Sequence, residues 1–153
     1  KDLIKQEDLW DYWQEKNDFG VLKTPLRIEG ETEYYANSLP LSGLPKIQIG
    51  IRTQPSIKTA KIKYELDTTR IKNDPYVKKD EINPVGNEAT ASTGHTLSGG
   101  CFPYTIFFRR NNIINFLSMR LPGYECLSEN EKRELQEYAS LIDERIKSTI
   151  SEN

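Results

Sequence analysis

Residues 46–66 read KIQIGIRTQPSIKTAKIKYEL, and this stretch decides which fold the chain is expected to adopt. An apolar residue at every second position of 46–52 is typical of a β-strand with one buried face. A second run over 57–66 alternates in the same way, apart from one slip near Ala60 that a β-bulge would explain. Turn residues separate the two runs, so the sequence predicts a β-hairpin.

The outer face of this predicted hairpin is strongly basic. It would carry five cations, which are Lys46, Arg52, Lys58, Lys61 and Lys63. Two more, Arg109 and Arg110, are expected at the tip of a second hairpin, where paired guanidinium groups suit carboxylate or phosphate recognition. Like charges on neighbouring strands disfavour their pairing, so we expect anions near this face. These seven residues are the predicted partner-binding site.

Charge is divided unevenly along the chain, although the formal net charge is only −2. Residues 46–72 carry seven cations and two anions, whereas residues 1–35 and 125–153 are both acidic. The acidic faces of terminal helices could therefore neutralise the basic face from within the chain. An acidic partner protein or the phosphates of a nucleic acid are the other two sources of anions.

The remaining pattern predicts an α+β fold. We expect an N-terminal helix over 2–17 and a long C-terminal helix over 129–150, which Ser128 and Glu131 would open as a capping box. An antiparallel sheet of four to five strands would pack with these helices on one face. The predicted strands cover residues 22–29, 46–52, 57–66, 103–108 and 113–121, although a short helix over 111–120 fits the last run nearly as well.

The organisation expected is a single domain over 1–153. The chain starts at Lys1 without a methionine, so we expect a processed product or part of a larger protein. Residues 85–100 (VGNEATASTGHTLSGG) contain almost nothing to bury and are predicted to form a flexible loop or an insertion. The only histidine, His95, lies within them, where it lacks the rigid support that a general base needs. The sequence indicates no cofactor or metal site and favours a non-catalytic role over an enzyme.

Location and redox state are only weakly constrained. No stretch approaches the roughly 20 apolar residues of a membrane-spanning helix, so we expect no membrane association. The chain has no Asn-x-Ser/Thr glycosylation motif, which favours an intracellular location, cytoplasmic or nuclear. Cys101 and Cys126 form no CxxC motif, and the sequence leaves open whether they pair with each other.

The leading hypothesis is a non-catalytic protein-interaction domain of a larger intracellular assembly. It would bind an acidic or extended partner segment through the basic sheet face. A nucleic-acid-binding domain that uses the same face is the alternative. A metal-dependent hydrolase or nuclease, built around His95 and acidic turns such as that of Asp80 and Glu81, is a further alternative. The sequence indicates neither a particular partner nor an oligomeric state.

Overall fold

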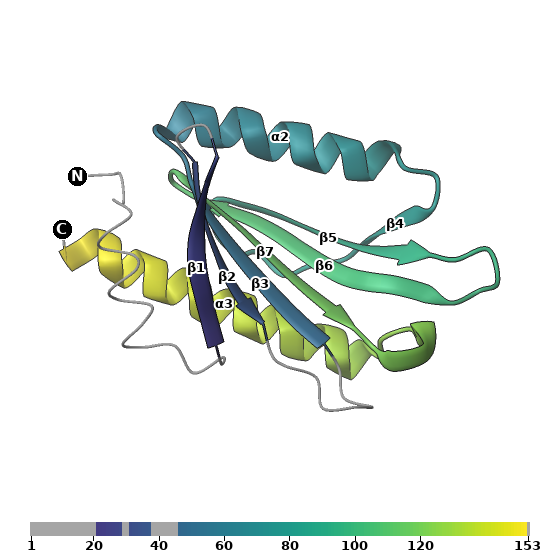
Figure 1. Ribbon diagram of the computed structural model, residues 1–153. Helices are drawn as coiled ribbons and strands as arrows, with labels where there is room; N and C mark the ends of the chain where they lie inside the picture. The colour runs from purple at the N-terminus through teal and green to yellow at the C-terminus, as the bar shows by residue number, and fades with distance from the viewer. Residues whose placement is uncertain (1–20, 29–30, 38–45, 153) are drawn as a thin grey trace.

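A computed structural model describes residues 21–28, 31–37 and 46–152, with side chains described over 50–148. In this part of the chain, an antiparallel sheet lies between two helices, one on each of its faces (Figure 1). The α+β class predicted from the sequence is thus confirmed. The helix predicted over 2–17 lies outside the described residues.

Seven described strands make up the sheet, in the order β1-β2-β3-β7-β6-β5-β4, and all neighbours are antiparallel. Two meanders, β1 to β3 and β4 to β7, therefore meet where β3 pairs with β7. The elements are β1 (Val21–Ile28), β2 (Glu31–Asn37), β3 (Lys46–Thr53), α2 (Ile57–Asn73), β4 (Val77–Asp80), β5 (Glu88–His95), β6 (Cys101–Arg110), β7 (Ile113–Arg120), the 3₁₀ turn η1 (Pro122–Tyr124) and α3 (Glu129–Glu152).

The strand predicted over 57–66 is wrong, because these residues begin the helix α2. Ser56 caps that helix, since its hydroxyl accepts a hydrogen bond from the Thr59 N–H (3.0 Å). Ala60 and Tyr64, four residues apart, are the buried positions of α2 and pack on the sheet. The slip near Ala60, interpreted above as a bulge, arises because residues 57–66 follow helical spacing throughout.

The loop predicted over residues 85–100 is wrong for half of its length. Strand β5 covers Glu88–His95 and pairs with β4 on one side and β6 on the other. Its small side chains, among them Ala91 and Ser92, are buried. Hydrogen bonds to two neighbouring strands, rather than large apolar side chains, hold this segment in place.

The other strand predictions agree better with the structure. Strands β1, β3, β6 and β7 match the predicted runs 22–29, 46–52, 103–108 and 113–121 to within about two residues, and the helix alternative over 111–120 is excluded. Helix α3 begins at the predicted capping box, where the Ser128 N–H donates to Glu131 Oε1 (2.9 Å) and the Glu131 N–H donates to Ser128 Oγ (3.2 Å). The short strands β2 and β4 were not predicted.

Alternation along β6 and β7 divides the core between the two helices. On one face, α3 packs against the main cluster through Leu135, Ala139, Ile142 and Ile146. On the other, Ala60 and Tyr64 of α2 pack on Phe107 and Ile114. Both helices therefore use the same two central strands, from opposite sides (Figure 1).

Two successive arginines of β6 are fixed by carboxylates on opposite faces of the sheet. Arg110 donates from Nε and Nη2 to the two carboxylate oxygens of Asp143 in α3, each at 2.8 Å. The Gly86 N–H also donates to Asp143 (3.0 Å). Arg109 is buried and donates from Nε to Glu88 Oε1 (2.8 Å). The hydrogen bonds to Asp143 raise the pKa of Arg110, so this guanidinium stays charged.

We predict that Asp143→Ala destabilises the fold strongly. Asp143 is 4% exposed, and its loss leaves a partly buried guanidinium and the Gly86 N–H without their acceptor. We expect the free energy of unfolding to fall by about 3 kcal/mol in urea denaturation. The matched control is Glu144→Ala, which removes an exposed contact to Lys147 and should cost less than about 0.5 kcal/mol. Equal losses in the two variants would show that the Arg110–Asp143 pair contributes little.

Candidate functional site at the β4 edge

The seven residues predicted as a binding site do not share one surface. Lys58, Lys61 and Lys63 all lie in the helix α2, so they cannot face outward from a sheet. Lys58 and Lys61 are exposed there. Lys46 lies in β3 opposite Arg120. The basic sheet face is therefore absent from the described structure, because its second strand is a helix.

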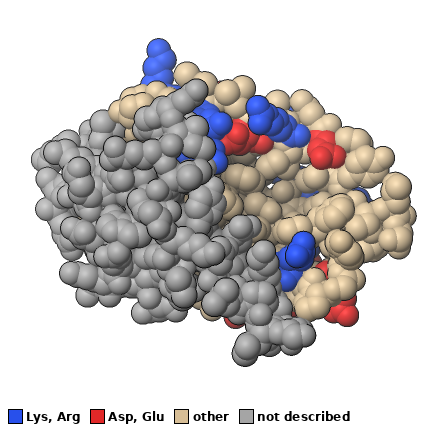
Figure 2. All heavy atoms as spheres, viewed as in Figure 1, with Lys and Arg blue, Asp and Glu red and all other residues tan. Residues whose placement is uncertain are grey.

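Most of the remaining predicted cations are engaged by acidic side chains of the same chain. Asp67 of α2 lies 3.6 Å from Arg52 and 3.7 Å from Lys63. Arg109 and Arg110 bind carboxylates, as described above. Along the upper margin of Figure 2, where α2 lies, Lys and Arg side chains are interspersed with Asp and Glu. Internal neutralisation thus accounts for four of these seven residues. The terminal helices, which the sequence predicted as its source, supply only Asp143, whereas Asp67 lies in α2 and Glu88 in β5.

A different region combines features of a binding surface, and it lies along β4. Strand β4 is an edge of the described sheet, since it pairs with β5 only. The His95 N–H donates to the Tyr76 carbonyl (2.7 Å). From this hydrogen-bonded pair onward, non-hydrogen-bonded and hydrogen-bonded pairs alternate between β4 and β5. With Lys79 opposite Ser92 in a non-hydrogen-bonded pair, the N–H and C=O of Lys79 point away from β5.

Beside this edge lies an apolar hollow of about 650 Å³. It is lined by Asp74, Tyr76, Val77, Gly94, His95, Thr96, Leu97, Ser98 and Phe102. Leu97 is 91% exposed, and Tyr76 and Phe102 are also exposed. Tyr124 adds a further exposed ring, in edge-to-face contact with Phe102 at 5.9 Å between centroids. Clustered exposed apolar side chains of this kind mark interaction surfaces.

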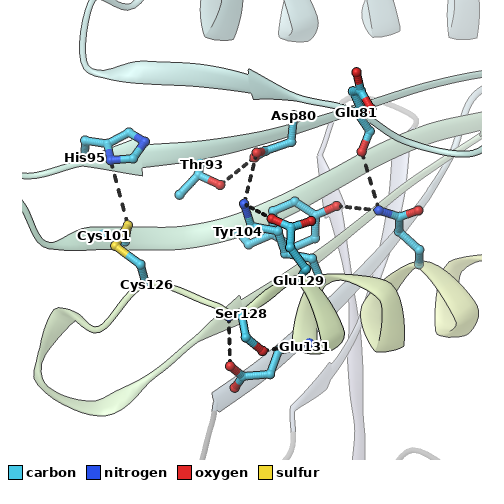
Figure 3. Close-up of polar contacts among 12 residues, drawn as sticks. Asp80, Glu81, Thr93, His95, Cys101, Tyr104, Cys126, Ser128, Glu129 and Glu131 are labelled. Carbon is cyan, nitrogen blue, oxygen red and sulfur yellow. Dashed lines mark hydrogen bonds and ion pairs between the residues drawn. A yellow bond between two sulfur atoms is a disulfide. The ribbon is translucent and has the colours of Figure 1, made fainter.

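A disulfide fixes the strand end that carries the apolar hollow. Cys101, the first residue of β6, is bonded to Cys126, which precedes α3. The question that the sequence left open is thus answered by the structure. The Nδ1 atom of His95 lies 3.8 Å from Cys101 Sγ (Figure 3). Because this sulfur is in a disulfide, His95 has no thiol beside it to activate as a nucleophile.

On the face covered by α3, polar contacts tie the edge strand to that helix (Figure 3). Asp80 of β4 accepts hydrogen bonds from Lys132 (3.1 Å) and from the hydroxyl of Thr93 (2.5 Å). The ammonium of Lys132 also lies 5.6 Å from the ring centroid of Tyr104, whose hydroxyl accepts from Gln136 (3.2 Å). Burial raises the pKa of Tyr104, so the phenol stays protonated near neutral pH. The only carboxylate of β4 is therefore engaged internally.

The two lysines of β4 contrast with its carboxylate. Lys78 and Lys79 are exposed, and neither forms an ion pair with a described residue. Side-chain alternation places Lys78 on the α3 side and Lys79 on the α2 side. The exposed edge is thus basic on both faces and apolar at one end.

Sequence reasoning missed these residues for identifiable reasons. Tyr76, Leu97 and Phe102 come from three segments that only the fold brings together. Leu97 lies in the segment predicted to be a loop, and Phe102 immediately precedes the predicted strand 103–108, so neither is indicated as a contact residue. A large apolar residue beside a glycine-rich turn was the one available signal.

Comparisons with known proteins give no assignment. No family model, no curated protein and no solved structure matches this chain. In the described part of the chain, no group of three or more His, Cys, Asp or Glu residues is placed to hold a metal ion. Within the same residues, neither helix has the length and apolar composition that crossing a membrane needs.

We predict that the Cys101–Cys126 disulfide contributes substantially to stability. It joins residues 25 positions apart, and cross-linking a loop of that length should stabilise the fold by about 2–4 kcal/mol. Thermal unfolding with and without dithiothreitol should therefore show a clear drop in Tm on reduction. The double variant Cys101→Ser/Cys126→Ser should match the reduced protein and ignore the reductant. Free thiols in the untreated protein would contradict the pairing.

Proposed function

We propose that this chain is a non-catalytic protein-interaction domain that binds an extended partner segment along the outer edge of β4. The observation that carries the proposal is an edge strand with outward backbone groups directly beside a cluster of exposed apolar side chains. An added strand would hydrogen-bond to the N–H and C=O of Lys79. A large apolar residue of the partner would enter the apolar hollow between Tyr76, Leu97 and Phe102.

The lysines of the β4 edge determine which charge the partner segment should carry. Lysine on an edge strand opposes pairing with another copy of the same edge, because like charges would then face each other. A partner with acidic residues near the added strand would relieve that repulsion. We therefore propose an extended segment that combines an apolar anchor with one or more acidic residues. The sequence predicted an acidic or extended partner, and the proposal places its site at β4 instead of the basic sheet face.

The alternatives from the sequence have less support. Nucleic-acid binding required the five cations of a single sheet face, and these are divided between β3 and α2. The metal-dependent hydrolase hypothesis required His95 and acidic turn residues such as Asp80 to form one site, whereas Asp80 is engaged by Lys132 and Thr93.

The disulfide also bears on location. Disulfides persist in oxidising compartments and are rare in the cytosol. We propose that the domain works in an oxidising compartment, in place of the intracellular location suggested by the missing glycosylation motif. The oxidation state of Cys101 and Cys126 in protein isolated from the source cell, trapped by alkylation before lysis, tests this. Free thiols in that sample would favour the cytoplasm.

Backbone pairing at β4 can be tested by a proline placed where only the outward N–H is lost. Lys79→Pro removes the donor that points away from β5 and leaves the ladder to β5 intact. The matched control, Lys79→Gln, removes the same charge and keeps the N–H. Peptides of twelve residues, selected from a random phage-displayed library on the disulfide-bonded protein, serve as the probe.

We expect the selected peptides to bind at least about tenfold more weakly to Lys79→Pro than to Lys79→Gln, because they lose a backbone hydrogen bond and their register. Leu97→Ser should also weaken binding and shift selection away from apolar anchors. Fluorescence anisotropy measures the affinities, and circular dichroism checks that each variant folds. Equal peptide affinity for the two Lys79 variants, or no enrichment at all, would contradict the proposal.

A further inference from the structure

A second hollow lies on the α2 side of the same edge and has a different chemistry. This polar cleft, of about 340 Å³, runs between α2 and strands β4 and β5. Its walls are Thr68, Thr69, Ile71, Lys72, Val77, Lys79, Thr90 and Ser92. They supply four hydroxyl groups and two ammonium groups, and no carboxylate lines the cleft. Such a lining is suited to an anionic ligand rich in oxygen acceptors.

The hydroxyl of Ser92 lines the cleft and is available to a ligand. Ser92 is only 5% exposed, yet its side chain forms no hydrogen bond with any described residue. Its neighbours are already engaged, since the Thr90 hydroxyl is hydrogen-bonded to that of Tyr64 (2.9 Å) and the Thr68 hydroxyl donates to the Tyr64 carbonyl (2.8 Å). The Ser92 hydroxyl lines the cleft and can donate a hydrogen bond to a group bound there.

The two lysines face the cleft from opposite walls. Lys72 lies in the last turn of α2 and Lys79 lies in β4. Neither forms an ion pair with a described residue. The C-terminal end of α2 carries about half a negative charge, which the two ammonium groups exceed. The cleft therefore keeps a net positive charge of about one and a half.

We propose that the polar cleft binds a small, doubly charged oxyanion with the charge and acceptor set of a phosphate monoester. Lys72 and Lys79 supply the charge, and Ser92 donates a hydrogen bond from the floor. Singly charged carboxylates match the cleft less well, because one ammonium group would stay uncompensated. The two proposed sites share Lys79, whose side chain lines the cleft and whose backbone faces the added strand, whereas Lys72 and Ser92 belong to the cleft alone.

The test is an NMR titration of the disulfide-bonded, ¹⁵N-labelled protein with inorganic phosphate, and separately with acetate, at constant ionic strength. In the wild-type protein we expect saturable shifts confined to amides of 68–72, 77–79 and 90–93. Acetate should bind at least about tenfold more weakly, since it can engage only one of the two charges. Lys72→Gln and Lys79→Gln should each weaken phosphate binding by about tenfold, and Ser92→Ala by a smaller factor.

Lys78→Gln is the matched control, because Lys78 neighbours Lys79 on the same strand but faces the other side of the sheet. It should leave the phosphate affinity within about twofold. Shifts spread over all surface lysines without saturation, or an equal loss in Lys78→Gln, would overturn the proposal and indicate an adventitious ion only. Lys72→Gln separates the two proposals, since Lys72 lies in α2 and not on the β4 edge: it should weaken phosphate binding and leave peptide binding unchanged.

Discussion

Strands β3 and β7 pair along eight residues, from Lys46 opposite Arg120 to Thr53 opposite Ile113. This pairing joins two meanders that are each local in sequence, and it places β7, β6 and β5 between β3 and β4. The segment that follows β3 must therefore cross the face of the sheet to reach β4, and α2 makes that crossing. The exposed β4 edge and the polar cleft beneath α2 are both consequences of this single contact.

The elements predicted well are those whose side-chain pattern admits one interpretation. Helix α3 combines a capping box with a long apolar stripe, and the run that forms β6 is too apolar to lie anywhere but the centre. The run that forms β7 was predicted as a strand, although a helix over 111–120 fitted its pattern nearly as well. Residues 57–66 admit two interpretations, because their apolar positions fit strand alternation nearly as well as helical spacing. Tertiary contacts determine that these residues form a helix, since Ala60 and Tyr64 pack on Phe107 and Ile114. These contacts cannot be read from the local sequence pattern.

The candidate site was harder to predict than the fold, for a related reason. Cations are easy to find in a sequence, but their partners are not, and Arg52, Arg109 and Arg110 are each engaged by an acidic residue of another element. The residues that remain available, such as Lys79 and Leu97, come from short segments with little pattern of their own. Strand β5 shows the same limit, because two flanking strands impose order on a sequence that resembles a loop.

The distance along the chain between β3 and β7 also shapes how the protein is made. During synthesis from the N-terminus, β3 emerges about sixty residues before the strand it will pair with. Until β7 arrives, one side of β3 presents unpaired backbone groups on an isoleucine-rich strand, which is the kind of edge that invites aggregation. The nascent chain is therefore most exposed to aggregation after β3 has emerged and before β7 can pair with it.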